Sequence, residues 1–157
     1  MTQPQEIPIT SEGLAQVTRE LEELVSVRRP EIVAKIKTAR EHGDLSENFE
    51  YHAARNEQSF IETRIRELEA IVKNHVIIES RASNGRVDLL SRVTFAEEGE
   101  SEETYRIVGP TEADPTAGRI SFESAIGKAL LGHRVGEEVE VETPAGGRYS
   151  IRILKIE

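Results

Sequence analysis

The spacing of apolar residues divides this chain into two parts, because a helical repeat ends near Ser80 and an alternating repeat follows it. Between Ser11 and Asn74 there are only one proline and two glycines. Apolar residues recur there three and four positions apart, which places them along one stripe of an α-helix. The first stripe comprises Leu14, Val17, Leu21, Leu24, Ile32, Ile36 and Ala39, and the second comprises Ala54, Ile61, Ile65, Leu68 and Val72. Two such stripes predict two long helices packed as in a two-stranded coiled coil.

The segment 43–48 interrupts the helical spacing and predicts the turn of an antiparallel hairpin. Gly43 can end the first helix at low steric cost. Either Asp44 or Ser46 can cap the second helix, and Glu47 would then lie in its first turn, where the helix dipole favours an acid. Each arm of about 30 residues would be about 45 Å long, at about 1.5 Å per residue.

Pro30 lies inside the first arm and disturbs its helical pattern. A proline within a helix removes one hydrogen bond and clashes with the preceding turn, and Arg28 stands where the stripe requires an apolar residue. The pattern permits either one kinked helix or two helices, with Pro30 at the first position of the second. We favour the kinked arm.

The second half of the chain reads as short strands with one helix. Alternation predicts strands over residues 92–96, 105–108 and 119–122, and a helix over 124–131 that Gly132 ends. Two further strands, over 138–142 and 149–153, flank a Pro-Ala-Gly-Gly turn, which is a strong hairpin signal. This half is therefore predicted to be a small, mostly antiparallel sheet with one helix.

Asp44 and Glu47 are the candidate catalytic residues at the tip. They stand three residues apart, so their carboxylates would share one side of the second helix if Asp44 begins it. Both acids can simply be caps and solvated charges. Alternatively, they can contribute to a Mg²⁺ site, since Mg²⁺ commonly uses one or two carboxylates together with water and substrate phosphate. Two exposed carboxylates bind the ion weakly alone, so such a site requires a partner that already holds metal.

Basic residues concentrate on the first arm just before the tip. Against the single acid Glu31, residues 28–40 contain five of them: Arg28, Arg29, Lys35, Lys37 and Arg40. Arg55 follows the tip and is expected to lie across from Arg40. The cluster predicts either a solvated face with pairs such as Glu31–Lys35, or a patch that contacts nucleic-acid phosphates.

The composition excludes several classes of site and partner. The 157 residues include no cysteine, which rules out disulfides, thiolate metal sites and a cysteine nucleophile. The net charge is −9, so nucleic acid can be bound only through a local patch. There is neither a secretion signal nor an apolar run of about 20 residues. We therefore expect a cytoplasmic protein with no membrane partner.

The tip and its flanks resemble a known family. The run Gly-Asp-Leu-Ser-Glu-Asn at 43–48, followed by Glu-Tyr-His-Ala-Ala-Arg at 50–55, resembles the bacterial transcript-cleavage factors of the GreA/GreB family. The similarity extends over nearly the whole chain, including residues 26–32, 39–42, 105–109, 112–114 and 144–147. The tip run is long and uncommon, which makes the match specific, and the moderate size of the basic patch favours the GreA branch.

This resemblance implies an α+β protein of two domains. Residues 1–80 would form an antiparallel α-helical coiled-coil hairpin with its tip at 43–48, and residues 81–157 a C-terminal domain of FKBP-like fold. The hairpin would enter the secondary channel of RNA polymerase. The factor would be a monomer that is not itself an enzyme, and it would stimulate the polymerase to cleave backtracked nascent RNA.

The resemblance also assigns roles to individual residues by position. Asp44 and Glu47 would be the tip acids that help the polymerase hold a second Mg²⁺ at the RNA 3′ end, with no cofactor of the factor's own. Arg40 and Arg55 would face the nascent RNA. The contact with the rim of the channel would be made by Glu123, Ser124 and Ala125.

Two departures from the family pattern leave alternatives open. Phe49 stands where a small alanine is usual, and Ala125 stands where proline is usual, which puts the stiffness of the rim contact in question. Some relatives with altered tips inhibit the polymerase, so an inhibitor or a coiled-coil adaptor without cleavage activity is the alternative function. A prolyl isomerase is disfavoured, because such pockets are lined by aromatic residues and the second half has only Phe95, Tyr105, Phe122 and Tyr149.

Overall fold

The computed structural model describes residues 5–43, 48–79 and 84–157 and divides them into two compact units. The first unit contains Leu14–His75, and the second contains Gln5–Gly13 together with Val76–Glu157. The nine-residue segment Gln5–Gly13 therefore belongs to the second unit, which the sequence did not indicate. Within the described residues, every helix is too short or too polar to cross a membrane.

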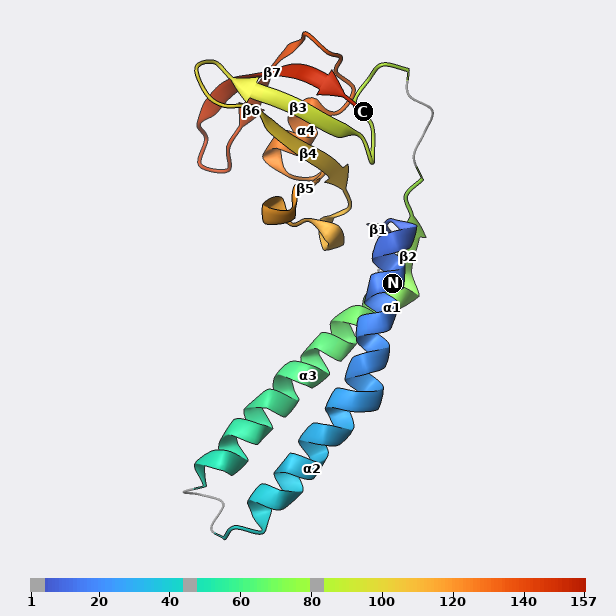
Figure 1. Cartoon of the computed structure of the whole chain (residues 1–157), viewed down its shortest axis with the longest axis vertical. Helices are drawn as coiled ribbons and strands as arrows, with labels where there is room; N and C mark the ends of the chain where they lie inside the picture. The colour runs from blue at the N-terminus through green and yellow to red at the C-terminus, as the bar shows by residue number, and fades with distance from the viewer. Residues whose placement is uncertain (1–4, 44–47, 80–83) are drawn as a thin grey trace. The chain divides into compact units, whose positions relative to one another are not determined.

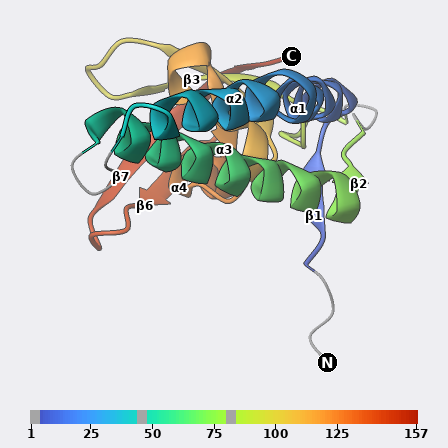
Figure 2. The ribbon, with the colours of Figure 1, turned by 90° about the horizontal axis from the view of Figure 1, so that it is seen from below.

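The first unit is a helical hairpin, as predicted. Helix α1 (Ser11–Glu23) continues through a π-helical turn (Leu24–Arg28) into α2 (Arg29–Arg40), and α3 (Phe49–Asn74) returns beside α2 (Figures 1 and 2). Both predicted stripes contribute buried residues to the hairpin, namely Ile32, Ile36, Ala39, Ala54, Ile61, Ile65 and Leu68. No residue of α1 is buried, so the closest packing of the hairpin lies between α2 and α3.

The π-helical turn allows the first arm to continue as a helix past Pro30. The N–H of Arg29 donates to the carbonyl of Leu24, five residues back, so this turn is one residue wider than an α-helical turn. The wider turn lies where the proline lacks an N–H and its ring would otherwise crowd the preceding turn. The backbone remains right-handed helical at Glu23 and Arg28. The arm is thus continuous, and the extra residue explains the change in the phase of the stripe.

The second unit is built on a five-stranded sheet in the order β5-β4-β3-β7-β6. Its strands are β3 (Arg92–Glu97), β4 (Glu103–Val108), β5 (Arg119–Ser121), β6 (Glu138–Glu142) and β7 (Arg148–Ile156). All neighbours are antiparallel except β4 and β5, which are parallel. Helix α4 (Ala125–Leu130) packs against β5 and β6. This antiparallel-rich sheet with one short helix confirms the predicted α+β class.

The core of the second unit is formed by alternate residues of the strands and by α4. Val93 and Phe95 of β3 are at most 1% exposed, as their alternation predicted. They pack with further buried residues of the sheet and α4: Ile107, Ile120, Leu130, Val139, Val141, Ile151 and Ile153. Phe95 stacks on Tyr105 with ring centroids 5.9 Å apart. Phe95 and Tyr105 therefore contribute to the core.

Two short strands, β1 (Ile7–Ile9) and β2 (His75–Ile77), form a separate two-stranded sheet that the sequence did not indicate. The pairing extends past β2, because the N–H of Ile78 donates to the carbonyl of Ile9 over 2.8 Å. The side chain of Ile9 is fully buried. Strand β1 is thereby bound to a segment about 70 positions further on.

Candidate nucleic-acid interface

Asn48 closes the hairpin next to the tip. Its Oδ1 accepts a hydrogen bond from the N–H of Tyr51 at 3.0 Å, and its Nδ2 donates to the carbonyl of Ala39 at 2.7 Å. One side chain therefore caps the start of α3 and binds the end of α2. The prediction that Asp44 or Ser46 caps the second helix is wrong, because α3 begins one residue after Asn48.

The two candidate catalytic acids lie outside the described residues. Asp44 and Glu47 both fall in the gap between residues 43 and 48, so their predicted roles stay predictions. The described residues around the gap show how its ends are held. Gly43, with φ at +113°, adopts a conformation that favours glycine, and Asn48 fixes the other end. The acidic residue in the first turn of α3 is Glu50.

Three of the five cations in residues 28–40 form ion pairs with carboxylates of α3. Glu57 accepts from both Arg28 (3.1 Å) and Lys35 (3.2 Å). The proposed pair between neighbouring turns, Glu31–Lys35, is therefore replaced by a pair across the two arms. Sequence spacing could not reveal this, because it shows partners on one helix and not on the next.

A second pair across the arms joins Arg29 to Glu62. Nε and one terminal nitrogen of the guanidinium donate to the two carboxylate oxygens at 2.8 and 2.9 Å. These hydrogen bonds raise the pKa of Arg29 and lower the pKa of Glu62. Both shifts favour the charged pair, so this part of the arm is held by charge and has little net charge to attract an anion.

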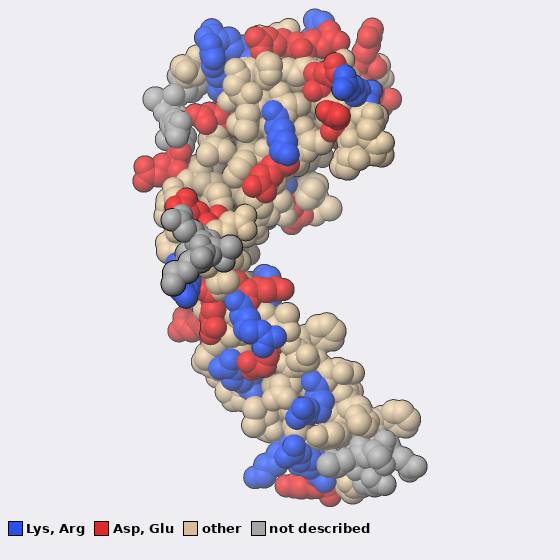
Figure 3. All heavy atoms as spheres, turned by 180° about the vertical axis from the view of Figure 1, so that it is seen from behind, with Lys and Arg blue, Asp and Glu red and all other residues tan. Residues whose placement is uncertain are grey.

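The cations nearest the tip remain available. Among the described residues, Lys37, Arg40 and Arg55 form no ion pair, and all three side chains are exposed. They line one hollow of about 530 Å³ on the hairpin together with Val33, Ile36, Glu41 and Gln58. The prediction that Arg55 lies near Arg40 is confirmed to this extent. Lys and Arg side chains are visible close to the tip in Figure 3.

Tyr51 holds Arg40 at the edge of this hollow. The guanidinium carbon of Arg40 lies 5.8 Å from the centroid of the Tyr51 ring, within the range of a cation–π contact. Tyr51 is in the first turn of α3, which Asn48 caps. The position of Arg40 therefore depends on both arms. This contact could not be predicted from the sequence, because an aromatic residue in a helix is more commonly part of the core.

The three residues assigned to the rim contact lie at the start of α4. Ser124 is the cap of the helix: its Oγ accepts from the N–H of Gly127 at 3.1 Å and donates to the carbonyl of Ser121 at 2.6 Å. Glu123 and Ala125 line a hollow of about 580 Å³ between α4 and the β6–β7 hairpin. The serine cap orders this turn without a proline at position 125.

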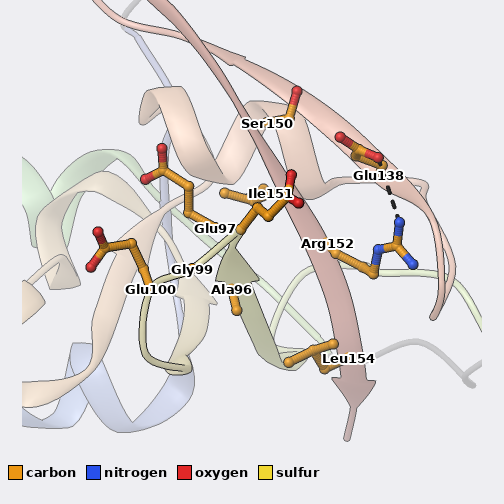
Figure 4. Close-up of a pocket in the computed structure, with 10 residues that line it drawn as sticks. Ala96, Glu97, Gly99, Glu100, Glu138, Ser150, Ile151, Arg152 and Leu154 are labelled. Atoms are coloured by element: carbon orange, nitrogen blue, oxygen red, sulfur yellow. Dashed lines mark ion pairs between the residues drawn. The ribbon is translucent and has the colours of Figure 1, made fainter.

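A third hollow lies on the sheet of the second unit (Figure 4). It measures about 630 Å³ and is lined by the loop after β3 and by residues of β6 and β7. Four of its lining residues are acidic, and Arg152 pairs with one of them, Glu138, at 3.6 Å. An acidic lining repels phosphate, so this hollow is no candidate for nucleic acid.

The described residues do not form a metal site of their own. Among residues 5–43, 48–79 and 84–157, no three His, Asp or Glu side chains gather closely enough to hold an ion. None of the four aromatic residues of the second half lines the three hollows described above. These hollows therefore lack the aromatic lining that a prolyl isomerase pocket requires.

Comparison with known proteins identifies relatives over the whole length. Residues 7–77 match the family described as "Transcription elongation factor, N-terminal", and residues 82–157 match "Transcription elongation factor, GreA/GreB, C-term". The transcription elongation factor GreA of Macrococcus caseolyticus is 50% identical over 157 residues, covering 99% of each chain. The GreA of Staphylococcus aureus strain JH9 is 47% identical and covers all of both chains.

Solved structures of similar proteins include two Gfh1 proteins. One, described as the transcription factor Gfh1, is 32% identical, with 99% of each chain covered and a TM-score of 0.48. The GreA factor homolog 1 of Thermus thermophilus is also 32% identical, with 98% of this chain and 99% of that chain covered and a TM-score of 0.45.

Proposed function

Because the chain belongs to the GreA/GreB family of transcription elongation factors, we propose that it binds RNA polymerase through the secondary channel and stimulates cleavage of backtracked nascent RNA. In this proposal the factor is an activator of the polymerase and has no catalytic activity alone. The hairpin carries the tip to the polymerase active centre, and the second unit contacts the rim of the channel.

One observation carries this proposal: at the tip end of the hairpin, three exposed cations that form no ion pair among the described residues line one hollow. Glu57 and Glu62 neutralise the cations further from the tip, whereas Lys37, Arg40 and Arg55 line one hollow beside it. Phosphate oxygens are the natural partners of such side chains. On a chain with a net charge of −9, this local patch directs RNA to one place and leaves the rest of the surface unfavourable for it.

The tip acids supply the chemistry in this proposal. Asp44 and Glu47 would hold Mg²⁺ jointly with the polymerase, and a second ion at the scissile phosphate stabilises the attacking and leaving oxygens. Carboxylate oxygens suit this hard cation, and the described residues offer no other metal cluster. The chain's own contribution is to present the two acids between helix ends that Gly43 and Asn48 define.

Isosteric substitutions of the tip acids test the proposal directly. Asp44→Asn and Glu47→Gln keep the size of each side chain but replace a carboxylate with an amide, a much poorer ligand for Mg²⁺. We expect each variant to lose most RNA cleavage by stalled polymerase while still competing with the unaltered factor for the polymerase. Binding without cleavage by the unaltered protein would instead establish the inhibitor or adaptor alternative.

The basic hollow is tested by the pair Arg40→Ala and Arg55→Ala, with Arg66→Ala as the matched control. Arg66 is an exposed cation on the same helix as Arg55 but outside the hollow. We expect the double substitution to weaken cleavage of RNA backtracked by many nucleotides, with the largest difference from the unaltered protein at low salt, because salt screens phosphate contacts. Equal losses for short and long backtracked RNA, or an equal loss in Arg66→Ala, would contradict an RNA-facing role.

A further inference from the structure

Glu112 reaches from the second half of the chain to the first turn of α1. One carboxylate oxygen accepts from the N–H of Thr10 at 2.9 Å, and the other accepts from the Thr10 hydroxyl. The same hydroxyl accepts from the N–H of Gly13 at 3.0 Å, so Thr10 is the cap of α1. Thr10 is only 4% exposed. The carboxylate therefore completes a buried helix cap from 102 positions away in the sequence.

The backbone that carries Glu112 is itself held in place. Residues Pro110–Glu112 form a 3₁₀ turn in which the N–H of Glu112 donates to the carbonyl of Gly109 at 3.1 Å. Nε of Arg119 donates to the carbonyl of Glu112 at 3.0 Å. Gly109 also lies against the carbonyl of Pro8 so closely that no Cβ would fit. Strand β1 and the carboxylate are thus fixed to the same turn.

Gly13 makes room for the carboxylate. A Cβ on Gly13 would lie 2.5 Å from Cδ of Glu112 and 2.8 Å from its Cγ, so the Glu112 side chain would have to move. The φ angle of Gly13 is not positive, so its backbone does not require glycine. Glycine is less favourable than alanine in a helix, because it loses more backbone freedom on folding. The close approach of Glu112 is therefore the reason that we find for a glycine in this turn.

We propose that Glu112 is a positioning residue that fixes the start of the arm to the second unit. Helix α1 crosses the boundary between the units, since Gly13 belongs to the second and Leu14 to the first. The carboxylate binds the end of the helix that lies in the second unit through charge-assisted hydrogen bonds, which are stronger than hydrogen bonds between neutral groups. Loss of these bonds leaves the first turn free to fray and lets the arm take more directions.

The functional consequence rests on the proposed function above. If the tip acts in the polymerase active centre, its approach must be accurate, because a misplacement of about 1 Å can cost about 100-fold in rate. Glu112 then contributes to the cleavage rate in the bound complex. It contributes little to affinity, because it lies outside the proposed rim contact at residues 123–125.

Two variants and one control test this role. Glu112→Gln keeps the shape but removes the charge, so its hydrogen bonds with Thr10 are no longer charge-assisted. Gly13→Ala leaves Glu112 intact, favours the helix and displaces the carboxylate. Glu12→Gln is the control: it removes one acid from the same turn, but its side chain is 82% exposed and pairs with Arg106 only at 3.7 Å.

The first measurement needs no polymerase. The chain has no cysteine, so cysteines introduced at exposed Asn56 and Glu100 accept one spin label in each unit. We expect a broader distance distribution in Glu112→Gln and Gly13→Ala than in the unaltered protein and Glu12→Gln, with unchanged helical content. An unchanged distribution in both variants overturns the proposal, even if the proposed function holds.

The second measurement separates rate from affinity. At saturating factor we expect both variants to cleave stalled RNA about 10- to 100-fold more slowly, with polymerase affinity changed less than about twofold, since the binding contacts lie elsewhere. Weaker binding with a normal saturated rate would overturn the positioning role. If the unaltered protein supports no cleavage, the proposed function fails, and the distance distributions still decide whether Glu112 fixes the arm.

Discussion

Asn48 offers a stringent test of the hairpin, because one side chain makes two separable hydrogen bonds. Asn48→Ala removes both the Oδ1 acceptor for Tyr51 and the Nδ2 donor for Ala39. A lost helix cap costs about 1 kcal/mol, and an unsatisfied partner of the lost donor costs about 1 kcal/mol more. We therefore expect Asn48→Ala to lower the unfolding free energy of the hairpin by about 2 kcal/mol.

Asn48→Asp divides this loss into its two parts. Aspartate caps a helix as well as asparagine does, so the bond to Tyr51 persists, but a carboxylate cannot donate to Ala39. The expected loss is about 1 kcal/mol, which is about 4–8 °C in Tm for a domain of 60–100 residues. Thermal unfolding followed by far-ultraviolet circular dichroism reports mainly the helical unit, and exchange of the Tyr51 amide reports the cap.

The order of stability of the three proteins tests whether Asn48 makes both hydrogen bonds. The unaltered protein should be the most stable, Asn48→Asp intermediate and Asn48→Ala the least stable, with the Tyr51 amide losing protection only in Asn48→Ala. Equal destabilisation by the two substitutions, or none by alanine, would show that Asn48 does not join the two arms in the way the distances indicate.

Three further results are expected from other contacts. The bonds between Glu62 and Arg29 should stabilise the protein above the ordinary pKa of glutamate, and this contribution should be lost as the pH falls through the lowered pKa of Glu62. In urea unfolding, a difference in unfolding free energy between the unaltered protein and Glu62→Gln that persists in acid would contradict this. Ser124→Ala should lower protection of the Gly127 amide and cost about 1 kcal/mol, whereas an unchanged exchange rate would refute the cap. Phe49→Ala should change the unfolding free energy by less than about 0.5 kcal/mol, because the side chain is 88% exposed; a larger loss on denaturation would reveal packing.

The sequence was most informative where the periodicity of burial was strong. Ile32, Ile36, Ile61 and Ile65 follow a helical stripe and are buried in the hairpin, and the alternation of β3 predicted that Val93 and Phe95 face the core. Such patterns directly reflect which side of an element faces away from water. The hairpin and most of the sheet could therefore be predicted.

Features that depend on contacts between distant segments could not be predicted. Nothing in the local sequence shows that Lys35 pairs with Glu57 instead of its neighbour Glu31, or that the Tyr51 ring contacts Arg40, because these contacts join separate helices. Strand β1 has only three residues and contains a proline, too few to show alternation. The cap at Asn48 was within reach, since asparagine is a common cap, but Asp44 and Ser46 satisfied the same rule.

The place of the first strand in the second unit has a consequence for synthesis of the chain on the ribosome. The hairpin, Leu14–His75, is built from contacts close in sequence and can fold once that stretch has emerged. The sheet cannot close until β7, which lies between β3 and β6, has been made. Gln5–Gly13 precedes the hairpin in the chain, yet it gains its carboxylate partner only after about a hundred more residues. This segment can pair with β2 once the hairpin has been made, but it finds its last native partner only later, and until then its apolar residues remain available to chaperones.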